Sequence, residues 1–168
     1  MSVFTSFTTT KLFMRDANGR YATATPEAVL EMARVIIDQK MQRGESFTSP
    51  EAVKDYLRVK LAGFEHEVFA ILMLDNQHRL IAYSELFRGT VGNTSVHPRE
   101  VIKEVLAKNA AAVILAHNHP SGHPEPSSAD REITDRLQAA LEMIDVRILD
   151  HIVVGGLKTV SFVEKGLL

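Results

Sequence analysis

The stretch AHNHPSGHPEPSSAD, residues 116–130, gathers side chains that are able to hold a metal ion. His117 and His119 stand two residues apart, and side chains at that spacing on a strand point to the same face. The prolines and the glycine that follow cannot continue a strand, so the chain must loop back and deliver Asp130 to the start of a helix. Two imidazole nitrogens and one carboxylate oxygen form an open zinc set, in which a bound water has its pKa lowered to about 7. The predicted chemistry is therefore hydrolysis assisted by Zn²⁺.

Each half of this pattern also has an ordinary structural explanation. A His-x-His pair often occurs without a metal, and the segment from Ser127 to Asp130 fits a capping box, S-x-x-D. Ser127 is able either to cap the helix or to point at the metal, and the sequence leaves both roles open. The two halves together, at the end of a buried strand, favour the metal site, because a capped helix and a metal-bound Asp130 are compatible.

Apolar residues at helical spacing, preceded by N-cap and first-turn proline signals, predict the helices that surround this segment. The first runs from Pro26 to near Gly44, the second from Pro50 to Gly63, the third over residues 98–110 and the fourth over residues 133–144. In the third helix we expect a stripe that faces the core, made of Val101, Ile102, Val105 and Leu106.

Nearly continuous apolar runs predict the strands. Residues 67–75 and 79–86 indicate a hairpin of buried strands around a polar turn, and residues 110–116 indicate a strand that leads into His117. Closing strands are expected at residues 146–149, 151–156 and 158–164. Residues 1–24 fit either a frayed terminus or an edge strand, and both readings stay open. The alternation of strands and helices predicts an α/β fold.

The composition fits one globular domain with a small extension. The chain has 168 residues, of which 45% are hydrophobic and 24% charged, and this length is enough to bury a core. We expect an N-terminal extension with one helix at residues 1–45 and a metal-binding domain at residues 46–168. Because the first twenty residues lack a secretory signal and no run is long enough to cross a bilayer, a cytoplasmic protein is expected.

Two further features of the composition narrow the chemistry. There is no cysteine, so a metal must be held by His, Asp, Glu or solvent, and no thiolate is present as a nucleophile. The formal net charge is −2, which gives no basic footprint of the kind that binds a phosphate backbone. Nucleic acid is therefore not indicated as a partner by charge, and a homodimer is left open.

The motif resembles that of a known family. His117-x-His119-Pro120, followed by Ser127 and Asp130, is similar to the JAMM motif of the JAB/MPN metalloproteases, and HNHPSG with PSSAD resembles its bacterial RadC branch. The resemblance extends from Phe47 to the end of the chain through FRGT (87–90), HPRE (97–100) and DHIVVG (150–155). Longer RadC proteins carry an N-terminal helix-hairpin-helix region, and the first 45 residues show no such hairpin, so the chain resembles the short form.

This resemblance implies an MPN fold, which is cytidine-deaminase-like and has a mixed β-sheet flanked by helices. It also implies a role for Glu67, which matches an acidic residue at the start of an early strand in JAMM enzymes. His117, His119 and Asp130 would hold Zn²⁺ and Glu67 would activate the bound water. The metal and the Ser127 hydroxyl would then stabilise the oxyanion.

Several other polar residues are weaker candidates. Glu65 and Glu85 rival Glu67 as the acid, and His123 competes as a metal ligand, although a solvated loop histidine is the expected role. Asp150 and His151 could support the metal site or line a groove beside it. For His151, a structural histidine with satisfied hydrogen bonds is an equal alternative. Arg88 and Arg99 are expected to face solvent, with contact to an anionic substrate as the alternative.

Three functions follow from these observations. The first is a zinc-dependent hydrolase of JAMM type that cleaves peptide or isopeptide bonds in a peptide or protein substrate. The second is a metal-dependent nuclease or DNA-repair accessory factor, since the RadC family is linked by name to DNA repair. The third is a non-catalytic interaction module that carries a metal.

Overall fold

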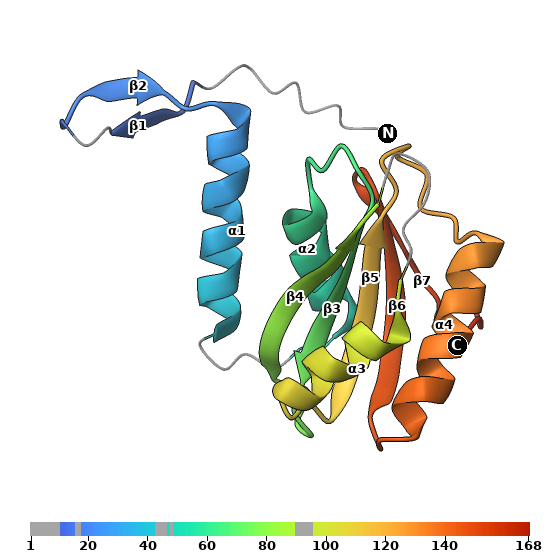
Figure 1. Cartoon of the computed structure of the whole chain (residues 1–168). Helices are drawn as coiled ribbons and strands as arrows, with labels where there is room; N and C mark the ends of the chain where they lie inside the picture. The colour runs from blue at the N-terminus through green and yellow to red at the C-terminus, as the bar shows by residue number, and fades with distance from the viewer. Residues whose placement is uncertain (1–10, 16–17, 43–46, 48, 90–95) are drawn as a thin grey trace.

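The fold is built around a five-stranded sheet with helices on both faces (Figure 1). The computed structural model describes residues 11–15, 18–42, 47, 49–89 and 96–168. The strands are β1 (Phe13–Arg15), β2 (Tyr21–Thr23), β3 (Val68–Leu74), β4 (Leu80–Arg88), β5 (Ala112–Asn118), β6 (Arg147–Gly155) and β7 (Lys158–Ser161). The helices are α1 (Pro26–Gln42), α2 (Pro50–Leu61), α3 (Pro98–Ala107) and α4 (Ser128–Glu142).

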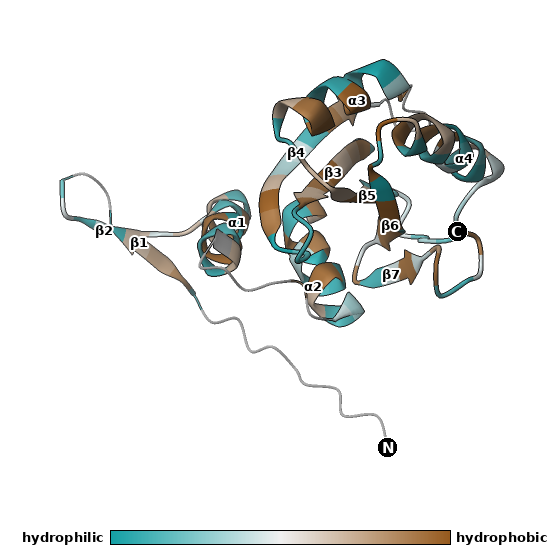
Figure 2. Cartoon of the chain, turned by 90° about the horizontal axis from the view of Figure 1, so that it is seen from below, coloured by the Kyte–Doolittle hydropathy of each residue, from teal (hydrophilic) through white to brown (hydrophobic). Residues whose placement is uncertain are grey.

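The strand order in the main sheet is β4-β3-β5-β6-β7. The central pair β5 and β6 is parallel, while the pairs β3–β4, β3–β5 and β6–β7 are antiparallel. Helix α4 connects the two parallel strands, and α3 lies beside it on the same face, while α2 covers the opposite face (Figure 2). The predicted α/β class, with a mixed sheet flanked by helices, is confirmed.

The core lies on both faces of β3 and β5, the two strands in which every residue is buried. Alternate residues of a strand point to opposite faces, so Ile114 packs into the cluster under α2, whereas Val113 and Leu115 pack into the cluster under α3 and α4. His117 follows the same alternation and therefore emerges on the face of α3 and α4. Burial on both faces explains why β3 and β5 read as continuous apolar runs.

Several expectations about these elements are wrong. Strand β4 is only partly buried, and β7 ends at Ser161 and not at residue 164. Residues 146–149 and 151–156 were expected as separate strands, but β6 is continuous from Arg147 to Gly155, with a register irregularity against β5 between Val113 and Ile114. Leu106 was expected to face the core, but it is 58% exposed, while Val101 and Val105 are fully buried. The α3 stripe is therefore narrower than the apolar pattern suggests.

The described part of the N-terminal region forms a small antiparallel hairpin of β1 and β2, followed by α1. Helix α1 lies beside α2, and Asp38 joins them because its carboxylate accepts hydrogen bonds from Tyr56 Oη at 2.7 Å and Lys60 Nζ at 2.8 Å. The expected end of this helix near Gly44 lies outside the described residues, and the domain boundary at residue 45 stays a prediction. Within the ranges that the structure describes, no helix has the length and apolar character needed to span a membrane.

Candidate metal centre

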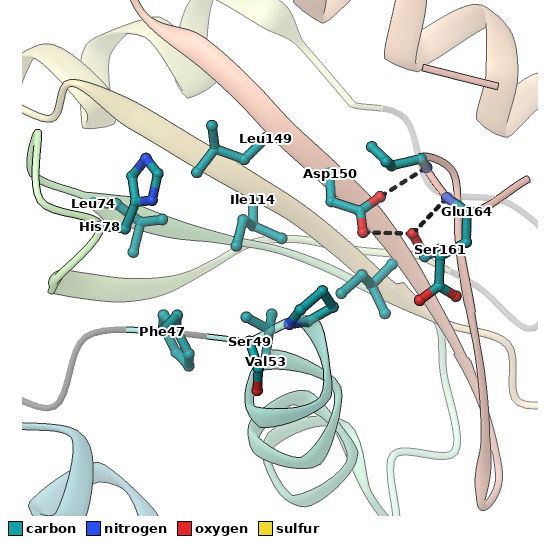
Figure 3. Close-up of a pocket in the computed structure, with 13 residues that line it drawn as sticks. Phe47, Ser49, Val53, Leu74, His78, Ile114, Leu149, Asp150, Ser161 and Glu164 are labelled. Carbon is teal, nitrogen blue, oxygen red and sulfur yellow. Dashed lines mark hydrogen bonds between the residues drawn. The ribbon is translucent and has the colours of Figure 1, made fainter. Parts of the chain in front are cut away.

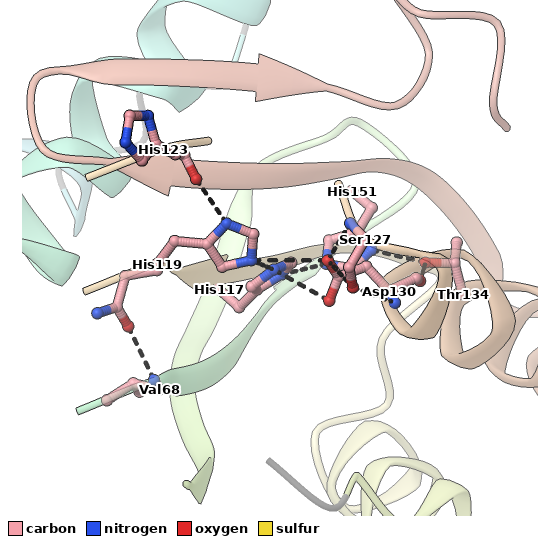
Figure 4. A network of polar contacts seen from close by, with 9 residues as sticks. Val68, His117, His119, His123, Ser127, Asp130, Thr134 and His151 are labelled. Carbon is pink, nitrogen blue, oxygen red and sulfur yellow. Dashed lines mark hydrogen bonds and ion pairs between the residues drawn. The ribbon is translucent and has the colours of Figure 1, made fainter. Parts of the chain in front are cut away.

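The structure brings His117, His119 and Asp130 together at one end of the sheet (Figure 4). His117 lies near the end of β5, His119 follows directly after that strand, and Asp130 is in the first turn of α4. His117 Nε2 lies 3.0 Å from His119 Nε2 and 3.3 Å from Asp130 Oδ1, and His119 Nε2 lies 3.6 Å from Asp130 Oδ2. The three side chains that the sequence predicted as metal ligands therefore lie close together in the structure.

These separations fit a tetrahedral metal ion. Zinc binds nitrogen and oxygen ligands at about 2.0–2.1 Å, and two ligand atoms of a tetrahedron with such bonds lie about 3.3–3.4 Å apart. The distances of 3.0 Å between the two Nε2 atoms and 3.3 Å from His117 Nε2 to Asp130 Oδ1 lie near that value, while the 3.6 Å contact of His119 Nε2 reaches the other carboxylate oxygen, Oδ2. The three side chains could therefore hold a metal ion and leave one coordination position open.

The loop after β5 orients the ring of His119. His119 Nδ1 donates a hydrogen bond to the backbone carbonyl of His123 at 2.7 Å, so the lone pair of the neutral ring is on Nε2, toward Asp130. The loop can approach this closely because β6 ends in Gly155, where an added Cβ would lie 2.6 Å from the backbone nitrogen of Pro124. His123 therefore contributes its carbonyl, while its side chain is exposed.

His117 is oriented from inside the protein. It is 1% exposed, and its Nδ1 lies 2.9 Å from Nε2 of His151 on β6. His151 Nδ1 in turn lies 2.7 Å from the hydroxyl of Thr134 on α4. Burial lowers the pKa of His151 well below its ordinary value, and the ring is therefore neutral.

Asp130 is held by the cap of its own helix. Ser127 donates from its backbone nitrogen and its hydroxyl to Asp130 Oδ2, both at 2.7 Å, and the hydroxyl also accepts from the backbone nitrogen of Asp130 at 3.2 Å. This is a capping box, and it leaves Oδ1 toward His117. Burial alone would raise the pKa of the Asp130 carboxyl, but its contacts with the rings of His117 and His119 and the hydrogen bond from Ser127 outweigh burial and hold that pKa well below its usual range.

Glu67 lies at the start of β3, next to the cluster. Phe69 pairs with His117, and extending this antiparallel register by two residues places Glu67 opposite His119. The nearby Asp130 carboxylate raises the pKa of His119 against the opposing effect of burial, because it stabilises the protonated ring, and the negative charge of Glu67 adds to this rise. Glu67 is half-buried, whereas its rival Glu65 is exposed.

The other candidates lie apart from the cluster. Glu85 on β4 is paired with Arg88 at 3.3 Å, and the side chain of Arg99 is 85% exposed. Asp150 turns to the opposite face of β6 from His151 and accepts a hydrogen bond from the Ser161 hydroxyl at 2.6 Å. There it lines a largely apolar pocket with Phe47, Val53, Leu74 and Ile114 (Figure 3).

Sequence patterns missed two residues that support the site. Asn118 binds backbone groups of the segment around Glu67, and Thr134 contacts His151. Neither residue was a candidate from the sequence, and Thr134 carries no local signal because its partner is on another element. Asp150 and His151 are adjacent on a strand, so only one of their side chains can face the candidate metal ligands. That residue is His151.

Comparison with known proteins agrees with this geometry. A family model described as the RadC-like JAB domain matches residues 47–167. A UPF0758 protein of Vibrio cholerae is 63% identical over 140 residues, which cover 83% of this chain and 88% of that protein. UPF0758 proteins of Leptothrix cholodnii and Aeromonas hydrophila are 61% and 56% identical over 142 residues, and the match covers 84% of this chain but only 64% and 63% of those proteins. With its JAB-type arrangement of two histidines and an aspartate, the chain belongs to the RadC-like JAB domain family.

Proposed function

We propose that this protein is a zinc-dependent hydrolase of JAMM type that cleaves peptide or isopeptide bonds. The observation that supports this proposal is the convergence of His117, His119 and Asp130. Glu67 directly precedes β3, whose Phe69 pairs with His117. Two neutral imidazoles and one carboxylate supply a single negative charge. A divalent cation held by them keeps a net positive charge, as a hydrolytic site requires.

The metal would supply Lewis acidity, because zinc lowers the pKa of a coordinated water and polarises a carbonyl oxygen. The protein's own residues hold and orient the ligands. The His123 carbonyl and His151 set the rings of His119 and His117, and Ser127 sets the carboxylate of Asp130. A site that is preorganised in this way spends little free energy on rearrangement during the reaction.

Glu67 is the general base of the proposed reaction. It takes a proton from the attacking water and returns it to the leaving amine. Its backbone is fixed, because the Glu67 carbonyl accepts a hydrogen bond from the nitrogen of Gly89 at 2.8 Å. The half-buried Glu67 therefore extends from a fixed backbone position directly before β3.

Ser127 has two roles in this proposal that compete for one hydroxyl proton. In the structure the hydroxyl donates to Asp130 Oδ2 and so orients a metal ligand. Stabilisation of the oxyanion would require this proton to leave the carboxylate and turn to the substrate. A Ser127→Ala variant separates the roles, since loss of ligand orientation weakens zinc binding, whereas loss of an oxyanion donor lowers kcat alone.

The test compares zinc content with hydrolysis. Glu67→Gln is expected to keep stoichiometric zinc and to lose about 100-fold or more in kcat on model isopeptides and unfolded proteins. Glu65→Gln is the matched control, because this exposed neighbour is expected to leave both quantities unchanged. Equal hydrolysis by the Glu67 variant and wild type would remove Glu67 from the reaction.

The same preparation distinguishes the alternative functions. It is incubated with model isopeptides, unfolded proteins and single- or double-stranded DNA, with zinc and with chelator. Chelator-sensitive cleavage of DNA alone would overturn the peptidase proposal in favour of a nuclease. Full zinc occupancy without cleavage of any of these substrates would favour an interaction module.

A further inference from the structure

We propose that Thr134 and His151 are positioning residues that determine which ring nitrogen of His117 carries the proton. They form a chain of hydrogen bonds that begins at the backbone carbonyl of Asp130 and ends at His117 Nδ1 (Figure 4). The chain leaves the lone pair of His117 on Nε2, where the metal binds. This inference rests on the metal site of the proposed function and assigns its second layer of residues.

The direction of the chain is set at Thr134. Its hydroxyl lies 2.5 Å from the carbonyl oxygen of Asp130, and a carbonyl can only accept. The single hydroxyl proton is therefore donated to Asp130. At its 2.7 Å contact with His151 Nδ1, the Thr134 oxygen must then accept, so the proton of His151 is on Nδ1.

The next link follows from counting protons. A neutral imidazole has one N–H group, so His151 Nε2 carries a lone pair and accepts from His117 Nδ1 at 2.9 Å. His117 consequently has its own lone pair on Nε2, which faces His119 Nε2 and Asp130 Oδ1. The same state is imposed on His119 by a different group, the carbonyl of His123.

The ring of His151 is held in place by its neighbours. It is 0% exposed, Phe162 stacks on it with centroids 4.6 Å apart and an interplanar angle of 23°, and Phe69 meets it edge-on at 5.7 Å. The ring therefore cannot turn to exchange its two nitrogens without repacking the core. Because Asp130 is on α4 and His117 is on β5, this series of hydrogen bonds also couples the position of α4 to that of β5.

A purely structural role for the buried hydrogen bonds makes a different prediction. In that case removal of the Thr134 hydroxyl would lower stability, and zinc affinity and ring protonation would not respond. Thr134→Val keeps the shape of the side chain and removes the hydroxyl, and Thr134→Ser keeps the hydroxyl. Tyr56→Phe is the control, since it removes a buried hydroxyl that bonds to Asp38 on the face of the sheet covered by α2.

The experiment measures zinc affinity by competition with a chromophoric chelator, and ring protonation by ¹⁵N–¹H correlation spectra of metal-free, histidine-labelled protein. In wild type, both His117 and His151 are expected as the Nδ1–H form. Thr134→Val is expected to bind zinc about 10- to 100-fold more weakly, the usual effect of losing such an outer partner, and to show mixed ring forms. Thr134→Ser and Tyr56→Phe are expected within about threefold of wild type.

The possible outcomes are separable. An Nε2–H form of His151 in wild type, wild-type zinc affinity in Thr134→Val, or an equal loss in Thr134→Ser would each overturn the positioning role. Zinc binding with the expected ring forms but no hydrolysis would remove the proposed activity and leave the positioning role intact. A wild-type protein that binds no divalent metal would overturn both.

Discussion

Asn118 binds the backbone on both sides of Glu67. Its Oδ1 accepts a hydrogen bond from the nitrogen of Val68 at 2.8 Å, and its Nδ2 donates to the carbonyl of His66 at 3.0 Å. Asn118 sits between the two histidines of the cluster in sequence and is 4% exposed. One residue of the motif thus fixes the proposed base relative to the proposed metal ligands.

The first prediction concerns this link. Asn118→Ala should lower kcat about 10- to 100-fold while zinc binding stays close to that of wild type, because the base is displaced and the ligands are not. Zinc titration and kinetics on the same isopeptide measure the two effects. A loss of zinc equal to that of a ligand variant would show instead that Asn118 supports the histidines.

The second prediction separates ligands from their neighbours. His119→Ala and Asp130→Ala should each lose stoichiometric zinc, since each removes one of three ligand atoms. His123→Ala should retain it, because His123 contributes only its backbone carbonyl. Elemental analysis after dialysis measures the metal content. Full zinc in the His119 variant would contradict the ligand assignment.

The third prediction concerns Gly155 at the end of β6. In Gly155→Ala the new Cβ would lie 2.6–2.8 Å from backbone atoms of residues 122–124, and the loop that carries the His123 carbonyl must move. We expect a stability loss of about 1–3 kcal/mol and zinc binding weakened about 10-fold. Chemical denaturation and zinc titration test both.

The control for this variant is Gly156→Asn. Gly156 has φ +59° and no atom within 4 Å of an added Cβ, and asparagine tolerates this conformation. It should therefore bind zinc as wild type does. Equal zinc affinity in the Gly155 variant and wild type would show that the His123 carbonyl does not need the close packing of the loop.

The sequence predicted well what local patterns determine. The start of α2 is confirmed because Ser49 accepts from the nitrogen of Ala52 and Pro50 opens the helix. Strands β3 and β5 are confirmed because full burial requires unbroken apolar runs. The convergence of the histidines and Asp130 also followed from spacing, since it depends only on strand alternation and a loop that returns to a helix start.

The contacts that the sequence did not predict are tertiary. His151 reaches His117 across 34 positions and Asn118 reaches Val68 across 50, and no local pattern carries that information. The polar Asp150 also hid the continuity of β6, because it interrupts an apolar run. Its carboxylate is satisfied inside the strand by the nitrogen of His151 and the hydroxyl of Ser161.

The last prediction concerns how α1 is attached to the rest of the fold. Asp38 on α1 accepts from Tyr56, which is 1% exposed, and from Lys60, which is 8% exposed. Asp38→Ala would leave a buried hydroxyl and a buried ammonium without this partner, although Lys60 keeps its contact with the Tyr83 ring at 4.4 Å. We expect a loss of about 1–3 kcal/mol in the free energy of unfolding.

Glu31→Ala is the matched control on the same helix. Glu31 pairs with Arg34 at 3.4 Å, but its side chain is 69% exposed, and exposed pairs contribute about 0–1 kcal/mol. Urea denaturation of the metal-free protein compares the two variants, and zinc affinity should be unchanged in both because α1 lies beside α2, on the opposite face of the sheet from α4. If Asp38→Ala costs no more than Glu31→Ala, the Asp38 hydrogen bonds do not hold α1 in place, and its attachment must come from other contacts, such as the hydrogen bonds of Arg34 to the carbonyls of Lys60 and Ala62.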